Sequence, residues 1–405
     1  MVTVALLGTM DTKGAEYEWI SRRLVDLGCT PLAINCGVYP PAIPVDIDAD
    51  ELANAAGTSL EALRASGDRG KAMTAMAKGA GIVLARLQEE GRIDGVLALG
   101  GSGGSSVAGT AMQALPVGFP KLLVSTMASG DVSPYVGTTD VTLMYSVVDV
   151  AGINSISRQV LGNAAAAIAG MAGRPVEKAG SDERPLIAAS MFGVTTSCVT
   201  AARTRLEELG YEVVVFHATG SGGRSMERLV ASGFFSGVLD LTTTELADEL
   251  VGGVLTAGPD RLEAAGRAAV PQVVSLGALD MVNFGPRSTV PAEFESRHLH
   301  VHNDTVTLMR TTKEEMAQLG RIVGEKLTRS ASPTTVFIPL KGVSAIDVDG
   351  APFRDEAADE AMFVALREEL TGSQVRLVEL DNAINDAAFA LATADELHRL
   401  IQRPN

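Results

Sequence analysis

The chain has 405 residues, of which 46% are hydrophobic and 20% are charged, and its formal net charge is −16. This length suits two domains of ordinary size, and the apolar content excludes a disordered protein. The negative charge, without any Lys/Arg-rich stretch, argues against nucleic acid and anionic membranes as partners.

Three cysteines are too few for a disulfide framework or a four-cysteine zinc site. The N-terminal residues are typical of a first strand and lack the basic start of a signal peptide, and no apolar stretch is long enough to span a bilayer. We therefore expect a soluble, cytoplasmic protein.

Short apolar runs alternate with amphipathic segments along the first half. The expected strands are Val2–Gly8, Thr30–Gly37, Gly95–Gly100 and Lys121–Ser125. The expected helices are Glu16–Leu27, Gly70–Glu90, Ser106–Ala114 and Ser157–Met171. This alternation predicts a parallel sheet with helices on both faces.

Charged residues, Gly and Pro collect at residues 174–185, which places a boundary between domains 1–180 and 181–405. The alternation then restarts. The expected strands are Leu186–Ser190, Tyr211–Ala218, Gly237–Leu241, Gln272–Gly277, Thr305–Arg310, Thr335–Leu340 and Val375–Leu380. The expected helices are Thr200–Leu209, Glu245–Gly252 and Glu314–Thr328. The predicted fold class is α/β, with two Rossmann-like doubly wound domains, mainly parallel sheets and a cleft between them.

Each half carries Gly-Ser-Gly-Gly after a strand, at 101–104 and at 220–223. An internal duplication would explain this echo. The general likeness of any two doubly wound domains explains it equally well.

The segment from Gly95 to Ser106 is a buried strand that runs into glycines and serines before a helix. Glycine allows close backbone approach, so successive N–H groups can converge on an anion at the positive end of the helix. A tight turn without a ligand is the alternative. The candidate phosphate-binding residues are Gly100, Gly101, Ser102, Gly103, Gly104 and Ser105.

The second glycine-rich loop offers similar chemistry together with Arg224, whose fork suits phosphate or carboxylate. Its strand ends at His217, which could equally be a hydrogen-bonded core histidine. The candidate binding residues here are His217, Thr219, Gly220, Gly222 and Gly223.

Two further loops come after the first and fourth strands, at the sheet edge where ligands bind in open α/β folds. The first contributes Thr9, Asp11, Lys13 and Gly14, and the other contributes Ser129, Gly130 and Asp131. Asp11 or Asp131 could hold Mg²⁺ beside phosphates, and Lys13 could neutralise one phosphate. Helix capping is the competing interpretation of these side chains.

The only histidine cluster is His298, His300 and His302, which would share one face of an extended strand. Such a face could bind a transition metal, although a plain strand is favoured because no second Cys or His cluster accompanies it. No motif typical of a hydrolase is present.

Several of these motifs together resemble a known family. They are Gly8-Thr-Met-Asp-Thr-Lys-Gly14, Gly100-Gly-Ser-Gly-Gly-Ser105, Ser125-Thr-Met-Ala-Ser-Gly-Asp131, Leu239-Asp-Leu-Thr-Thr-Thr-Glu245 and Asp280-Met-Val-Asn-Phe-Gly285. The chain resembles the ATP-binding domain shared by the tomato mosaic virus resistance protein and a large group of uncharacterised bacterial proteins.

The resemblance implies two Rossmann-like subdomains, a homodimer, and ATP bound with Mg²⁺. It also implies a separate barrel-type enzyme as a partner, because the plant member continues into such a domain. The chain departs from the family pattern at Ala383, where a His is usual, and this casts doubt on any catalytic role built on that His.

The function we expect is that of an ATP- or nucleotide-binding protein of unknown reaction. One alternative is an enzyme that acts on a small acid in the cleft, with ATP as cosubstrate. Another is a dimeric interaction protein that nucleotide stabilises. The irregular segments Val282–Arg297 and Val343–Phe353 could bury a neighbour's surface or close over the ligand.

Overall fold

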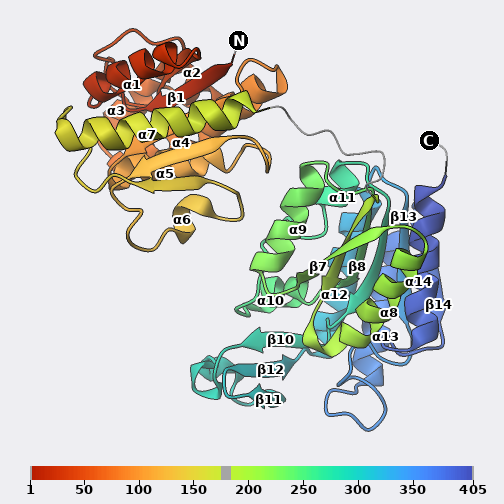
Figure 1. The fold of residues 1–405 in the computed structure, drawn as a ribbon. Coiled ribbons are helices and arrows are strands. Elements are labelled where there is room, and N and C mark those ends of the chain that lie inside the picture. Colours follow the sequence, from red (N-terminus) through yellow and green to blue (C-terminus); the bar gives the residue numbers. More distant parts are fainter. Residues whose placement is uncertain (1, 175–183, 404–405) are drawn as a thin grey trace. The chain divides into compact units, whose positions relative to one another are not determined.

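The computed structural model describes residues 2–174 and 184–403. The chain divides into two compact units, Met1–Lys178 and Ala179–Asn405, and each is described here by itself (Figure 1). The boundary expected after residue 180 falls on residues outside the described ranges.

The first unit contains a five-stranded sheet in the order β2-β1-β3-β4-β5, and every strand pair in it is parallel. Its strands are β1 (Thr3–Gly8), β2 (Thr30–Asn35), β3 (Gly95–Gly100), β4 (Lys121–Ser125) and β5 (Thr142–Tyr145). The four strands expected in this half are confirmed, and β5 is an additional edge strand.

Helices cover both faces of this sheet, as the alternating pattern predicted. They are α1 (Gly14–Asp26), α2 (Ala49–Ala55), α3 (Leu60–Ser66), α4 (Arg69–Glu89), α5 (Ser102–Met112), α6 (Ser133–Val136) and α7 (Ser155–Gly173). In β1, Ala5 and Leu7 pack with α2 to α5, whereas Val4 and Leu6 pack with α1 and α7. The strand is therefore buried on both faces, which is why it reads as a continuous apolar run.

The second unit contains a six-stranded parallel sheet in the order β14-β13-β9-β8-β6-β7 and a separate three-stranded antiparallel sheet in the order β10-β12-β11. The parallel strands are β6 (Leu186–Met191), β7 (Glu212–His217), β8 (Gly237–Thr242), β9 (Gln272–Gly277), β13 (Thr334–Pro339) and β14 (Arg376–Leu380). The antiparallel strands are β10 (Met281–Phe284), β11 (Leu299–Asn303) and β12 (Val306–Arg310).

The strand expected at Thr305–Arg310 is confirmed as β12, which belongs to the antiparallel sheet. One expectation for this region needs correction. The segment Val282–Arg297, expected to be irregular, contains most of β10 and two short 3-10 turns. A strand of four residues is too short to produce a clear periodic signal, so the sequence pattern does not indicate β10.

The helices of the second unit lie on both faces of its parallel sheet. They are α8 (Thr196–Glu208), α9 (Ser221–Ala231), α10 (Glu245–Val251), α11 (Ala264–Arg267), α12 (Lys313–Thr328), α13 (Glu356–Leu370) and α14 (Ala387–Ile401), with a 3-10 turn at Gly193–Thr195. One face packs on α8 and α14, and the other packs on α9, α12 and α13. Four of these helices, α9, α11, α13 and α14, were not among the helices predicted from the sequence.

The glycine-rich segments are the first turns of helices and not loops before them. Helix α5 begins at Ser102, although the sequence placed its start at Ser106. Small residues are required there because the turn lies against the end of β3. A Cβ on Gly100 would lie 2.5 Å from the backbone nitrogen of Ser105.

Both parallel sheets share one topology, in which the first strand lies between the second and the third. The Gly-Ser-Gly-Gly segments do not correspond within it. The segment at 101–104 comes after the third strand of its unit, whereas the segment at 220–223 comes after the second strand of the other unit. The similarity of these two segments therefore does not support an internal duplication.

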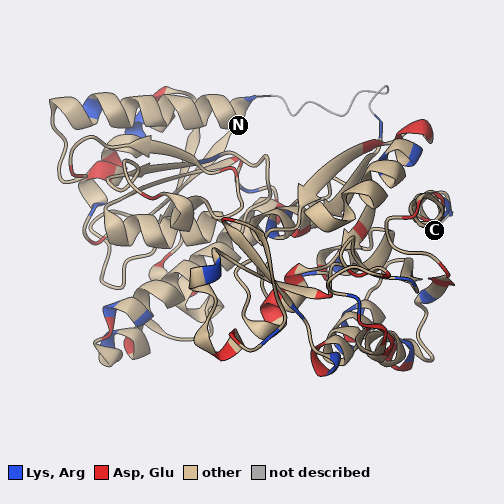
Figure 2. Cartoon of the chain, turned by 90° about the horizontal axis from the view of Figure 1, so that it is seen from below, with Lys and Arg blue, Asp and Glu red and all other residues tan. Residues whose placement is uncertain are grey.

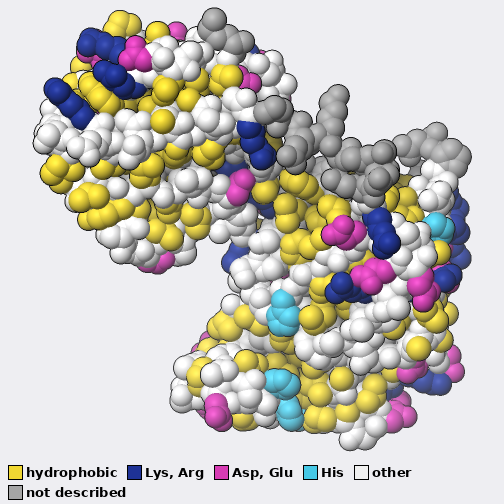
Figure 3. Space-filling view, in the orientation of Figure 1, with side chains coloured by type: hydrophobic (Ala, Val, Ile, Leu, Met, Phe, Trp, Pro, Cys, Tyr) yellow, Lys and Arg dark blue, Asp and Glu magenta, His cyan; other side chains and the backbone are white. Residues whose placement is uncertain are grey.

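Charged residues of both signs are interspersed along the ribbon (Figure 2). On the face drawn in Figure 3, hydrophobic side chains are scattered among polar ones. None of the helices in the described part of the chain is long and apolar enough to cross a membrane.

Candidate functional site

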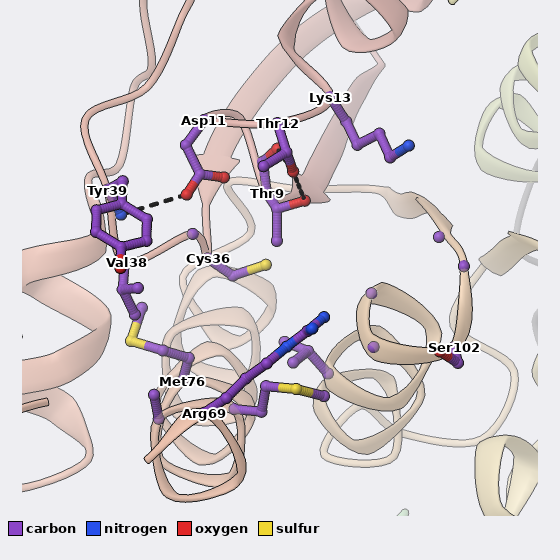
Figure 4. A pocket seen from close by; sticks show the side chains of 18 of the residues that line it. Thr9, Asp11, Thr12, Lys13, Cys36, Val38, Tyr39, Arg69, Met76 and Ser102 are labelled. Atoms are coloured by element: carbon purple, nitrogen blue, oxygen red, sulfur yellow. Dashed lines mark hydrogen bonds between the residues drawn. The ribbon is translucent and has the colours of Figure 1, made fainter. Parts of the chain in front are cut away.

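A cavity of about 610 Å³ opens in the first unit at the carboxyl ends of β1 and β3 (Figure 4). The strand order of an open α/β sheet reverses between these two strands, and ligands bind at such a switch point. Only residues of the first unit line the cavity. The predicted site residues among them are Thr9, Asp11, Lys13, Gly100, Gly101, Ser102, Gly103 and Gly104.

The start of α5 forms one wall of this cavity. Gly101 is its N-cap and has no side chain to satisfy the free amides of the first turn. Within the described residues, no acceptor is found for the backbone N–H groups of Ser102, Gly103 and Gly104. The first turn therefore presents free donors at the positive end of the helix dipole, which is the usual setting for an anion.

Ser105 was predicted to bind the ligand, but it faces the protein core. Its hydroxyl lies 2.6 Å from the hydroxyl of Ser125 and 3.2 Å from the Gly100 carbonyl oxygen. The side chain is fully buried and does not line the cavity. Its role is to fix the turn that positions the three free amides.

The loop after β1 supplies the polar side chains on the opposite wall. The hydroxyls of Thr9 and Thr12 lie 2.9 Å apart, and the Lys13 ammonium donates to the Val150 carbonyl. One carboxylate oxygen of Asp11 accepts from the Tyr39 amide at 3.3 Å, while the other, Oδ1, has no hydrogen-bond partner in the described residues. These groups offer a carboxylate and an ammonium on one side of the cavity.

Gly14 was also predicted to contact the ligand. It does not line the cavity and instead begins α1. A Cβ at this position would lie 3.0 Å from the Cβ of Ala42, so packing accounts for the glycine.

Arg69 is a cavity residue that sequence reasoning missed. It is the first residue of α4, and its Nη2 lies 3.3 Å from the position that a Cβ on Gly103 would take. The described residues provide neither an ion pair nor a hydrogen bond for its guanidinium group. Arg69 therefore places an unpaired positive charge beside the free amides of α5 (Figure 4). No motif marks it, because only the packing of α4 against α5 brings it there.

Part of the remaining wall is apolar, and Arg64, Asp68 and Asp149 also line the cavity. Val38 and Tyr39 come after β2, and Met73 and Met76 lie on α4. Thioether and aromatic side chains form an adaptable surface for a flat or irregular apolar group. The cavity thus combines an anion-binding end with an apolar lobe.

The loop after β4 lies outside this arrangement. Ser129, Gly130 and Asp131 do not line the cavity. The Asp131 carboxylate accepts from the Ser133 hydroxyl at 2.7 Å and from the Ser133 amide at 3.0 Å, and these bonds hold its pKa below the usual value. Asp131 thus stabilises the start of the short helix α6, in line with the capping interpretation.

The second glycine-rich segment is already occupied by a side chain of the same unit. The amides of Gly220 and Gly223 donate to Oε1 of Glu245 at 2.7 and 3.1 Å. The other oxygen of Glu245 accepts from Nε of Arg261 at 2.7 Å. Glu245 and Arg261 are both fully buried. A phosphate at the start of α9 would have to displace this carboxylate.

The side chains beside this turn do not form a comparable cavity wall. His217 is exposed and lies 5.5 Å from the Phe192 ring, measured between ring centres. The Thr219 hydroxyl donates to the His217 carbonyl at 3.2 Å. Gly222 is required by packing, since a Cβ there would lie 1.9 Å from the same carbonyl oxygen.

Arg261 is the centre of a buried network that the sequence did not reveal. Its guanidinium also contacts Asp240, at 2.7 Å between Nη2 and Oδ1, and Glu227 at 3.1 Å. Burial raises the pKa of Glu227, partly opposed by the charge of Arg261. The network links β8, α9 and α10, and no part of it lines the cavity of the first unit.

The histidine cluster does not form a metal centre. His298 and His300 lie against Phe353, with ring centres 5.1 and 6.0 Å away. His302 lies at an irregularity in the pairing of β11 with β12. The described part of the chain contains no group of three His, Cys, Asp or Glu residues arranged to hold a metal ion.

Two parallel α/β units, one of them with a ligand-sized cavity at its switch point, define a two-domain Rossmann-like protein. The chain belongs to the Uncharacterised protein family (UPF0261). The model of its N-terminal domain matches residues 2–177, and that of its C-terminal domain matches residues 184–401.

Curated relatives agree with this assignment. A UPF0261 protein of Clostridium tetani is 52% identical over 402 residues, which cover 99% of each chain. The ToMV resistance protein Tm-1(GCR237) of Solanum lycopersicum is 46% identical over 332 residues, which cover 81% of this chain and 44% of the tomato protein.

Solved structures show only remote likeness. A Streptomyces glycosyltransferase complexed with thymidine diphosphate matches with a TM-score of 0.20 and 13% identity, covering 98% of this chain and 100% of that one. A UDP-GlcNAc 2-epimerase from Neisseria meningitidis matches with a TM-score of 0.23 and 10% identity, covering 68% and 82%. At these scores, neither match bears on function.

Proposed function

We propose that this protein binds a nucleotide, with ATP as the first candidate, in the cavity of its first unit. The phosphates would lie on the free amides of Ser102, Gly103 and Gly104 and beside the Arg69 guanidinium. The base would lie against the apolar lobe. The observation that carries this proposal is the first turn of α5, whose unpaired donors face a cavity of about 610 Å³.

The size and chemistry of the cavity support a nucleotide over a smaller anion. Sites for small molecules and cofactors usually measure about 300–1,000 Å³ and combine apolar walls with a few polar groups. A free phosphate would use only the α5 end and leave Val38, Tyr39 and Met76 without a partner. A ligand with both an anionic and a flat apolar part uses both ends.

The arrangement at α9 supports placing the phosphates in the first unit only. Glu245 supplies the negative charge that a phosphate would otherwise bring to this helix. Its removal would leave Arg261 without one of its buried partners, which costs several kcal/mol in comparable buried ion pairs. We therefore expect one nucleotide per chain.

Magnesium is part of this proposal through Asp11. Mg²⁺ is commonly held by one or two carboxylates together with substrate phosphates and water. Asp11 lines the cavity, has one oxygen without a hydrogen-bond partner, and fits that role better than Asp131, which lies outside the cavity. When bound, Mg²⁺ would neutralise phosphate charge.

Two other functions could use the same site, and they differ in the result of nucleotide binding. An enzyme that uses ATP on a small acid would release ADP or AMP only when the acceptor is present. An interaction protein would show a gain in stability alone. A barrel-type enzyme as a separate partner is a further proposal, which rests on the resemblance to the tomato protein family.

The test is a titration of the full chain with ATP–Mg²⁺, monitored by calorimetry and by melting temperature. A ligand that binds only the folded state stabilises it by about 2.7 kcal/mol at ~100 times its Kd. We expect a stoichiometry of one and a raised melting temperature. We also expect Arg69→Ala to weaken binding at least tenfold, because the variant loses a charge-assisted contact to phosphate.

Arg224→Ala is the matched control. Arg224 is also near a glycine-rich helix start, but it donates to the Thr256 carbonyl at 2.7 Å and lies in the second unit. Its variant should bind ATP like the parent. A folded parent that neither binds nor is stabilised at millimolar ATP–Mg²⁺ contradicts the proposal.

A further inference from the structure

Three carboxyl groups meet in the core of the second unit, and one of them, Asp280, is far from the other two in the sequence. Asp280 comes after β9, Asp347 comes after β13, and Asp359 lies on α13. At most 2% of each residue is exposed. They lie next to the antiparallel sheet, because Arg310, the last residue of β12, contacts Asp347 and Asp359.

Two guanidinium groups pair with two of these three acids, Asp347 and Asp359, and neither pairs with the Asp280 carboxylate. Arg310 donates to Asp359 at 2.9 Å and lies 3.7 Å from Asp347. Arg354 donates to the other oxygen of Asp359 at 2.6 Å and lies 3.9 Å from Asp347. Three carboxylates against two guanidiniums would leave one uncompensated negative charge in the core, which is costly.

The hydrogen bonds of the cluster also indicate that one of its carboxyl groups is protonated. The Ser344 hydroxyl donates to Asp280 Oδ2 at 2.8 Å, and the Val343 amide donates to Asp347 Oδ2 at 2.9 Å. The other oxygens, Asp280 Oδ1 and Asp347 Oδ1, receive no hydrogen bond from any described residue. Asp347 also lies within hydrogen-bonding reach of Asp359, and two carboxyls can share a hydrogen bond only when one is protonated.

We propose that Asp280, Asp347 and Asp359 form a buried proton-binding site that holds one proton at neutral pH and thereby fastens the antiparallel sheet to the parallel sheet. The proton neutralises the excess charge and supplies the missing donor. Arg310 then joins β12 of the antiparallel sheet to α13 and to the segment between β13 and α13, since its Nε also donates to the Phe353 carbonyl at 2.7 Å.

The surrounding charged groups do not compensate the excess negative charge of the three carboxylates. Arg354 is shared with the exposed Asp349 and Glu356, each at 3.4 Å. His298 and His300 lie on the ring of Phe353 and not on the carboxyls. The Arg310 Nη1 group donates to the Thr311 hydroxyl at 2.9 Å. No other ion pair to the three acids occurs among the described residues.

The direction of the pH dependence is set by burial. Burial raises the pKa of Asp359 to about 7, and burial raises the pKa of Asp280 and of Asp347 to about 6. Because the pKa of these carboxyl groups is raised in the folded state, the bound proton stabilises the fold fully at a pH below the pKa that the same groups have in the unfolded chain. This stabilisation is lost as the pH rises through about 6 to 7.

The experiment is denaturant unfolding of the full chain between pH 5.5 and 8, with the parent and Asp280→Asn. Asparagine imitates the protonated acid at every pH. Over the pH range in which the folded chain holds one proton more than the unfolded chain, the unfolding constant of the parent should rise about tenfold per pH unit. We expect Asp280→Asn to reduce this slope and to be more stable than the parent at pH 8.

Asp349→Asn is the matched control, because it makes the same change in an exposed acid that contacts the same Arg354. Its slope should equal that of the parent. Burial also raises the pKa of Asp248 to about 7, so Asp248 adds its own contribution to the pH dependence of stability. The variant Asp248→Asn measures that contribution. The proposal is overturned if Asp280→Asn keeps the parent's slope or is less stable than the parent at pH 8.

A direct measurement covers the case in which Asp280→Asn does not fold. The infrared spectrum of Asp248→Asn, which lacks the other buried acid with a pKa of about 7, should contain the carbonyl band of a buried protonated carboxyl group at pH 7, and this band should disappear toward pH 8.5. Absence of the band from the folded parent at pH 6 would also overturn the proposal.

Discussion

At the scale of single residues, the glycines at the start of α5 are needed for two different reasons. Gly100 is required by packing, since any side chain would strike the backbone of Ser105. Gly103 has ordinary helical surroundings without a positive φ, and a Cβ there would meet only the ends of Arg69 and Met73. Gly103 therefore belongs to the cavity wall more than to the fold.

This difference predicts the behaviour of Gly103→Val. The branched side chain would fill the space between the first turn and Arg69, so we expect ATP binding to weaken at least tenfold. The free energy of unfolding should change by no more than about 1 kcal/mol, because Val in a helix costs no more than Gly. Calorimetric titration and urea unfolding measure the two quantities.

Gly70→Val is the control for this substitution. Gly70 also lies in the first turn of a helix, α4, but it does not line the cavity, and its Cβ would meet only an Asp68 oxygen at 3.4 Å. Its variant should bind ATP like the parent. If Gly103→Val also binds like the parent, the phosphates do not lie on α5.

At the scale of elements, two helix starts of similar sequence have different partners. The start of α5 has free amides and a nearby unpaired arginine. The start of α9 is closed by Glu245, which comes from α10 and is held by Arg261. Equal local sequences thus lead to one available anion site and one that the protein fills itself.

Arg261 should therefore matter for stability more than an exposed arginine does. We expect Arg261→Met to lose about 3–5 kcal/mol of unfolding free energy, because two buried carboxylates and one half-buried carboxylate lose their shared partner. Urea unfolding at pH 7 measures this loss. Arg267→Met is the comparison. Arg267 also pairs with two acids but is 65% exposed, so its loss should stay below about 1 kcal/mol.

A loss below about 1 kcal/mol for Arg261→Met would contradict the view that this network anchors α9. Partial recovery of stability at lower pH would support it. Burial raises the pKa of Glu227, and protonation would relieve the uncompensated charge.

At the scale of the whole molecule, we propose that the chain forms a homodimer. Two-fold dimers are the commonest closed assemblies of soluble proteins. Light scattering at micromolar concentration should give about twice the 42.1 kDa of one chain. A mass of one chain contradicts the proposal, and a dimer that persists without nucleotide shows that ATP does not hold it together.

Much of the parallel architecture was predictable from the sequence. Strands that are buried on both faces need Val, Leu and Ile at most positions, so β3, β4, β8 and β9 stand out as short apolar runs between helical patterns. The antiparallel strands β10 and β11 are short or half-exposed and leave no comparable signal. Helix starts were placed late because Gly and Ser are poor helix formers that are nevertheless well suited to a first turn.

The sequence by itself also determined that glycine-rich turns would come after strands and that Thr9, Asp11 and Lys13 would lie at the ligand edge of the first sheet. Only the tertiary structure decided which of the two turns has backbone amides that are free to bind an anion. Glu245 lies more than twenty residues beyond Gly220 and closes that turn, whereas Arg69 lies more than thirty residues before Gly103 and leaves the other one charged and free. The physical reason is that an anion site depends on whether its donors are already satisfied, and those partners come from elements that only folding brings together.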